Sequence, residues 1–155
     1  MAAFETHSAE ETKALAAALA RVADAGDVVL LDGDLGAGKT QFSQGFGAAL
    51  GVSEPITSPT FNILLEYHSG RLPLYHFDLY RLEDELELED IGYYDVLEAD
   101  GVCLVEWADK FPDAFPEDYL GLRISIAPDG TRTLEATPAG PRAEELLGEW
   151  AWSRR

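Results

Sequence analysis

The sequence predicts an α/β fold, in which a mostly parallel sheet carries antiparallel strand additions and flanking helices. Two observations support this class. Short, fully apolar runs at residues 28–31 and 102–105 are typical of parallel strands that helices cover on both faces. Turn signals elsewhere separate pairs of β-type segments, which indicates hairpins. Because 155 residues are enough for one core but few for two, we expect a single domain over residues 1–155.

The N-terminal part alternates helical and extended patterns. Ser8 begins a capping box, so an Ala-rich helix is expected from there to about Asp24. The apolar strand at residues 28–31 follows, and a glycine-rich turn comes directly after it. Residues 39–50 fit a helix that Gly51 ends. This order of strand, glycine-rich turn and helix is the context in which phosphate-binding loops occur.

The remainder of the chain predicts two hairpins, a second buried strand and several helices. The turn residues 68–71 and 128–130 each join two β-type segments. The expected strands are residues 61–67, 72–77, 102–105, 120–127 and 131–137, and the expected helices are residues 84–90, 94–99 and 142–152.

The composition excludes several classes of protein. With 29 acidic and 11 basic residues, the net charge of −18 disfavours a protein that grips RNA or DNA unaided, and leaves either a solvated acidic surface or an acidic face for a basic partner. The single cysteine, Cys103, excludes a disulfide framework and a Cys-ligated zinc site. No basic, apolar leader and no long apolar stretch is present, so we expect a cytoplasmic protein without a membrane span.

The turn after the first apolar strand matches the complete P-loop pattern, Gly-x4-Gly-Lys-Thr. Its glycines allow backbone conformations that are closed to other residues, and successive N–H groups then form a nest for phosphate oxygens. We expect Lys39 to reach the β- and γ-phosphates and Thr40 to offer its hydroxyl to Mg²⁺. The nucleotide-binding residues predicted here are Gly33, Leu35, Gly36, Ala37, Gly38, Lys39 and Thr40.

A P-loop also needs acidic residues that organise the metal ion and the attacking water. Asp78 and Glu106 each follow an apolar run, as in a Walker B element. Glu106 follows the cleaner strand and is the first choice for Mg²⁺, directly or through water. Asp78 would complete the metal shell or orient the water. We therefore expect Lys39, Asp78 and Glu106 to be catalytic, with Thr40, Glu106 and Asp78 around the metal.

Three nearby residues are open to two interpretations each. Thr60 is either a switch residue that senses the γ-phosphate or an ordinary turn threonine. Trp107 either stacks near the nucleotide or belongs to the core. His76 is either a base or a strand residue, and we favour the strand residue.

The nucleotide and the reaction follow from what the sequence lacks. The only asparagine is Asn62, so the Asn-Lys-x-Asp motif that reads guanine is absent and ATP is favoured. No arginine-rich lid is evident, so hydrolysis to ADP and phosphate is the simpler inference. A small-molecule or protein kinase, or a nucleotide-gated interaction module, remains an alternative. The arginines are scattered, at Arg21, Arg71, Arg81, Arg123, Arg132, Arg142, Arg154 and Arg155.

Four motifs together resemble the TsaE (YjeE) family of bacterial ATPases, which are required for threonylcarbamoyladenosine formation in tRNA. They are the P-loop at residues 33–40, Ser-Pro-Thr-Phe at 58–61, His-Phe-Asp-Leu-Tyr-Arg-Leu at 76–82 and Leu-Val-Glu-Trp at 104–107. Their order and spacing agree with the family over roughly residues 5–140. One departure is Gln41, where many members have a second threonine.

The resemblance implies a P-loop core that binds ATP and Mg²⁺, has weak intrinsic ATPase activity and works with the proteins TsaB and TsaD, so that tRNA is engaged only indirectly. It assigns the essential acids to Asp78 and Glu106, the switch-like loop to Thr60, and the tryptophan beside the acid to Trp107. It also implies an adenine site between the N-terminal segment and the late hairpin, near Ala9 and residues Gly130 to Arg132.

Overall fold

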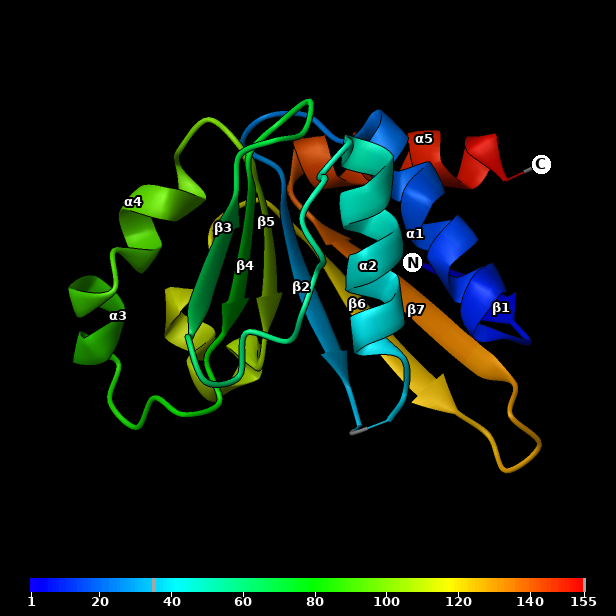
Figure 1. Cartoon of the computed structure of the whole chain (residues 1–155), viewed down its shortest axis with the longest axis horizontal. Coiled ribbons are helices and arrows are strands. Elements are labelled where there is room, and N and C mark those ends of the chain that lie inside the picture. The colour runs from blue at the N-terminus through cyan, green and yellow to red at the C-terminus, as the bar shows by residue number, and fades with distance from the viewer. Residues whose placement is uncertain (35, 155) are drawn as a thin grey trace.

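The computed structural model describes residues 1–34 and 36–154. Within them the strands form a seven-stranded sheet in the order β1-β7-β6-β2-β5-β4-β3 (Figure 1). The strands are β1 (Ala2–Thr6), β2 (Val28–Gly33), β3 (Leu64–Tyr67), β4 (Leu74–Asp78), β5 (Val102–Glu106), β6 (Tyr119–Ile126) and β7 (Arg132–Ala139).

The centre of the sheet is parallel and its edges are antiparallel. Strands β6, β2, β5 and β4 are parallel to one another. Antiparallel pairing adds β3 to β4 at one edge, and β7 and then β1 at the other. The predicted fold class and both predicted hairpins are therefore confirmed. Since β2 lies between two parallel partners, the turn that follows it lies in the middle of the row formed by the carboxyl ends of the parallel strands.

Helices pack on the two faces of this sheet (Figure 1). Alternate residues of β2 enter different cores: Leu31 joins the core under α1, α2 and α5, whereas Leu30 joins the core beside α3 and α4. Both faces of the strand are thus buried, as its apolar run predicts. The helices are α1 (Ala9–Val22), α2 (Lys39–Leu50), α3 (Leu86–Asp90), α4 (Tyr93–Leu97) and α5 (Pro141–Ser153), with short 3₁₀ turns η1 (Ala108–Lys110) and η2 (Pro112–Ala114).

Helix α1 begins as its sequence predicts and packs tightly on α2. The hydroxyl of Ser8 accepts a hydrogen bond from the Glu11 amide at 3.1 Å, while the Glu11 carboxylate accepts one from the His7 amide. On α2, a Cβ at Gly45 would lie 2.3 Å from the Lys13 carbonyl oxygen. Only glycine allows this approach, so Gly45 sets the separation of the two helices.

Two parts of the fold differ from the sequence prediction. Strand β1 was not predicted, because its sequence is short and alanine-rich, and pairing with β7 supplies its hydrogen bonds. Strand β3 begins at Leu64 rather than at residue 61, since residues 59–63 form a turn in which the Ile63 amide donates to the Pro59 carbonyl. Across the described residues, no helix is both long enough and apolar enough to cross a membrane.

Candidate nucleotide site

The N-terminus of α2 is open to an anion. Its N-cap is Gly38, at a φ of 114° that favours glycine, and neither a side-chain cap nor an acidic first-turn residue is found there in the described part of the chain. Helix α1, by contrast, has Ser8 as its cap and acidic residues in its first turn. The positive end of the α2 dipole and its first-turn N–H groups therefore face outward, as in phosphate sites. The predicted contact at Leu35 lies outside the described residues.

Lys39 is the first residue of α2, and its ammonium group faces the end of β5. Its Nζ atom lies 3.8 Å from Oε1 of Glu106 and 4.7 Å from the ring centroid of Trp107. Both charged side chains are largely buried, at 11% and 9% exposure, which strengthens the attraction between them. The structure thus brings together three of the predicted site residues. Thr40, the next residue, is exposed at the same helix end.

The two predicted acids lie side by side. Asp78 and Glu106 are partners in the parallel register of β4 and β5, and both are buried. Each oxygen of Asp78 has a defined partner: Oδ2 accepts from the Thr60 hydroxyl at 3.0 Å and Oδ1 from the Tyr80 amide at 2.9 Å. Thr60 therefore reaches the site through Asp78, which links two loops around the strand ends.

His76 is the residue whose environment the sequence did not predict. It is a strand residue, as favoured above, but its Nε2 atom lies 2.6 Å from Oε2 of Glu106. The other ring nitrogen, Nδ1, is buried and has no hydrogen-bond partner among the described residues. Because side chains alternate along a strand, His76 lies on the same face of β4 as Asp78. This alternation is the feature of the sequence that could have indicated a role for His76 in the site.

Two residues beside the site have unusual backbones. Trp107, directly after Glu106, has a φ of 61°, and Ile63, at the end of the Thr60 loop, has a φ of 67°. Positive φ is uncommon outside glycine and is a true outlier for the β-branched Ile63. The Ile63 carbonyl accepts a hydrogen bond from the Asp78 amide, so both strained residues adjoin an acid. Such strain gathers at functional sites because surrounding contacts must hold it in place.

Of the two residues predicted on the late hairpin, Arg132 lies beside the P-loop. The Cδ and Nε atoms of Arg132 lie 3.6 Å from the Cβ position of Gly38, and that Nε is buried without a hydrogen-bond partner in the described chain. Arg132 is therefore a cation beside the P-loop. Gly130 occupies the hairpin turn at a φ of 90°, and a Cβ there would meet nothing within 4 Å.

The residues present fit Mg²⁺ held mainly by a nucleotide. Within residues 1–34 and 36–154, no group of three or more His, Cys, Asp and Glu side chains could hold a metal ion by itself. Mg²⁺ in phosphate-transfer sites needs fewer ligands from the protein, because one or two carboxylates, phosphate oxygens and water complete its shell. Asp78, Glu106 and the Thr40 hydroxyl are oxygen donors of that kind.

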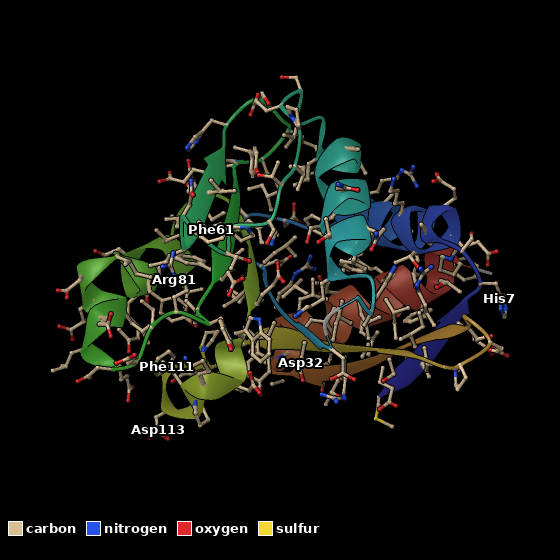
Figure 2. All side chains as sticks on the ribbon, turned by 60° about the horizontal axis from the view of Figure 1, so that its bottom comes forward. His7, Asp32, Phe61, Arg81, Phe111 and Asp113 are labelled. Atoms are coloured by element: carbon tan, nitrogen blue, oxygen red, sulfur yellow. The ribbon has the colours of Figure 1, made fainter. Side chains whose placement is uncertain are left out.

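Aromatic and basic side chains contact one another on the loops that adjoin the two acids. Arg81 stacks over the exposed ring of Phe61 with 5.5 Å between its guanidinium carbon and the ring centroid (Figure 2). Tyr80 packs against Trp107, and Lys110 donates to the carbonyls of Tyr80 and Leu82. These contacts fix the loop that follows Asp78.

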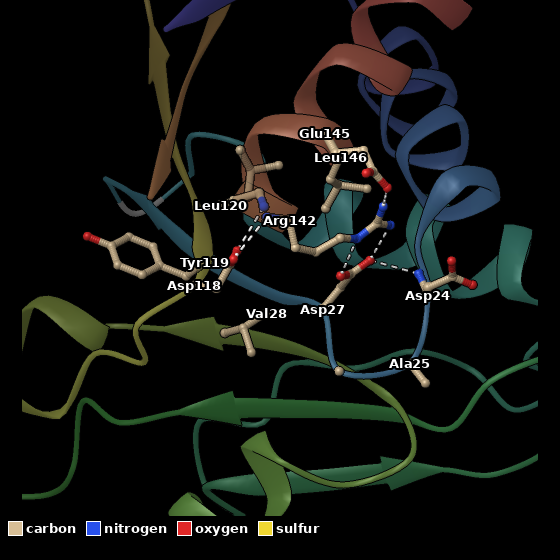
Figure 3. A pocket seen from close by; sticks show the side chains of 12 residues that line it. Asp24, Ala25, Asp27, Val28, Asp118, Tyr119, Leu120, Arg142, Glu145 and Leu146 are labelled. Carbon is tan, nitrogen blue, oxygen red and sulfur yellow. Dashed lines mark hydrogen bonds and ion pairs between the residues drawn. The ribbon is translucent and has the colours of Figure 1, made fainter. Parts of the chain in front are cut away.

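A cavity lies at the opposite end of β2 from the P-loop, and the polar groups that line it bind each other. Arg142 donates two hydrogen bonds of 2.9 Å to the buried carboxylate of Asp27 (Figure 3). Asp118 accepts from the Arg142 and Ala143 amides at the start of α5. The polar groups of this cavity thus supply each other's hydrogen bonds, and these bonds connect α5 to the sheet. The cavity is therefore a weaker candidate for a ligand site than the P-loop.

A glycine-rich turn that joins the central parallel strand β2 to an open helix N-terminus, with acids at the ends of β5 and β4, defines the P-loop class of nucleotide-binding proteins. The family described as "Threonylcarbamoyl adenosine biosynthesis protein TsaE" matches residues 6–134. The chain belongs to this TsaE family.

Individual relatives agree over nearly the whole chain. It is 47% identical over 146 residues to the tRNA threonylcarbamoyladenosine biosynthesis protein TsaE of Bacillus subtilis, covering 94% of this chain and 91% of that one. The protein of the same name from Nostoc is 41% identical over 141 residues, covering 89% and 86%. The crystal structure of Bacillus subtilis YdiB superposes with a TM-score of 0.88 and 39% identity, covering 99% of this chain and 96% of that one. The predicted family is thereby confirmed.

Proposed function

We propose that this protein binds ATP with Mg²⁺ at its P-loop and hydrolyses ATP slowly, as the ATPase subunit that acts with TsaB and TsaD in threonylcarbamoyladenosine modification of tRNA. Membership of the TsaE family supports the role in this modification. The net charge of −18 agrees with indirect engagement of tRNA, because repulsion opposes unaided binding.

One observation carries the proposal: Lys39, at the open N-terminus of α2, faces Glu106, and Glu106 lies beside Asp78 on the adjacent strand. Lys39 and the first-turn N–H groups would bind the β- and γ-phosphates, with Arg132 adding positive charge beside Gly38. Glu106, Asp78 and Thr40 would hold Mg²⁺. The metal ion would neutralise part of the negative charge of the phosphates. Thr60, whose hydroxyl donates a hydrogen bond to Asp78, would respond to the γ-phosphate.

The proposed chemistry is attack of water on the γ-phosphorus, which releases ADP and phosphate. The chain contributes mainly by orientation and charge, since phosphoryl transfer requires little covalent participation by the enzyme. Asp78 or Glu106 would orient the water. Trp107 would exclude bulk water beside Lys39, whose ammonium group lies over its ring.

The test compares ATP hydrolysis by the purified protein alone and with TsaB and TsaD. The wild type should turn over slowly alone and faster with both partners, and Lys39→Ala should abolish both rates. Glu106→Gln should lower kcat about 10²–10³-fold while ATP affinity changes little, because charge develops mainly in the transition state. Glu144→Gln, on the exposed start of α5, is the control for loss of one negative charge.

Two results would contradict the proposal. Unchanged turnover on adding TsaB and TsaD would remove the partner claim. Sustained tRNA modification by a Glu106→Gln variant that binds but does not hydrolyse ATP would instead indicate a nucleotide-gated interaction module.

A further inference from the structure

The carboxylate of Glu106 is held from two sides. Its Oε1 atom faces Lys39 at 3.8 Å, on the side of the P-loop. Its Oε2 atom faces Nε2 of His76 at 2.6 Å, from the neighbouring strand β4. A carboxylate with a separate partner on each oxygen has a fixed rotation about its last bond. The ring of His76 is itself 1% exposed, so packing fixes it in turn.

The chemistry of the pair sets which group donates. An ionised carboxylate only accepts hydrogen bonds, so Nε2 of His76 carries the proton and donates to Glu106. In the neutral ring, Nδ1 is then an acceptor, and it is buried without a donor among the described residues. A buried unsatisfied acceptor lowers stability. Fold stability alone therefore does not account for a histidine here, whereas its hydrogen bond to Glu106 serves the site.

We infer that His76 is a positioning residue: its Nε2–H group holds Oε2 of Glu106 so that Oε1 remains directed at the P-loop, where it faces Lys39 and would act on the bound nucleotide. The inference rests on the proposed ATP hydrolysis. Partners of this kind orient ligating carboxylates, and their removal typically costs 10–100-fold in activity.

Two substitutions that differ by one methylene group separate this role from simple packing. In glutamine the amide nitrogen is as many bonds from Cβ as Nε2 is in histidine, so His76→Gln retains a donor that reaches Glu106. Asparagine has the same amide but stops one bond short. Tyr75→Phe is the matched control, because it removes a hydrogen bond from the same strand, between the Tyr75 hydroxyl and Asp100, on the opposite face.

Turnover is measured with TsaB and TsaD present. His76→Asn should lower kcat about 10–100-fold with the KM for ATP within about twofold, since the bond orients Glu106 and does not bind the nucleotide. His76→Gln should recover most of kcat, and Tyr75→Phe should match the wild type. Equal losses in His76→Asn and His76→Gln, or full turnover in His76→Asn, would overturn the inference.

A spectroscopic test does not depend on activity. In protein labelled with ¹⁵N-histidine, His76 should show the Nε2–H tautomer and a slowly exchanging ring proton, and Glu106→Ala should abolish that protection. The exposed His7 and His68, which complete the set of 3 histidines, serve as internal references. An Nδ1–H tautomer would overturn the inference. If the wild type hydrolyses no ATP, the proposed function fails, and the spectrum still decides whether His76 donates to Glu106.

Discussion

Replacing Arg142 by methionine should destabilise the fold while leaving the nucleotide site intact. Arg142 makes two hydrogen bonds to Asp27, and the pKa of Arg142 is raised chiefly by this hydrogen bonding. Without the guanidinium group, the carboxylate of Asp27, 3% exposed, keeps the Asp24 amide as its one remaining donor among the residues that the structure describes. Breaking a buried pair from one side costs about 3–5 kcal/mol. Because the arginine is 29% exposed, water reaches the remaining charge, and we expect about 2–4 kcal/mol.

The assay is urea unfolding followed by circular dichroism, with thermal unfolding as a second measure. The slope m should be unchanged and the thermal midpoint should fall by about 5–15 °C for a chain of this size. Glu145→Gln is the control, since Glu145 is 64% exposed and its pair with Arg142 should be worth less than about 1 kcal/mol. Adding Asp27→Asn to Arg142→Met should restore part of the loss. If Arg142→Met costs no more than Glu145→Gln, the reasoning about burial is refuted.

Three other predictions concern the site and the core. Thr60→Val removes the donor to Asp78, so kcat should fall about 10-fold, and an unchanged kcat would leave Thr60 as a turn residue. ATP with Mg²⁺ at about 100 times its Kd should stabilise the protein by about 2.7 kcal/mol, an effect that thermal unfolding should detect in the wild type and not in Lys39→Ala. Burial raises the pKa of Cys103 from 9.0 to about 12, so alkylation at pH 8 should require unfolding. Because the folded thiol stays neutral, its contribution to stability should be lost as pH rises from 9 towards 12.

The parts of the fold that the sequence predicts are those whose signals are local. A capping hydroxyl at Ser8, an apolar run at β2 and a turn at residues 128–130 each specify structure within a few residues, and the structure has all three. Strand β1 depends instead on a distant partner. It pairs Phe4 with Leu134, and the Phe4 ring lies 4.4 Å from that of Trp150, contacts between residues far apart in the chain. No pattern within five alanine-rich residues encodes them.

The candidate site divides in the same way. The P-loop and the acids at 78 and 106 are visible because each has its own sequence context of strand and turn. The contacts that these residues make cannot be read from the sequence. That of His76 with Glu106, for example, depends on the register of β4 against β5. The approach of Arg132 to Gly38 depends equally on the pairing of β6 with β2 and of β7 with β6. The prediction that Arg132 lies near the adenine comes from the family resemblance, and composition and spacing alone do not yield it.

The packing of the core also explains why the charged groups meet. On α2, Phe42, Phe46 and Leu50 recur at helical spacing and pack into the core between the helix and the sheet, and Lys39 lies one turn before them on the same side. On β5, Leu104 packs into that core, so the period of two directs Glu106 to the same face. The apolar residues that bury the helix against the strand thus bring the lysine to the carboxylate, and they set the geometry of a site to which they contribute no charge.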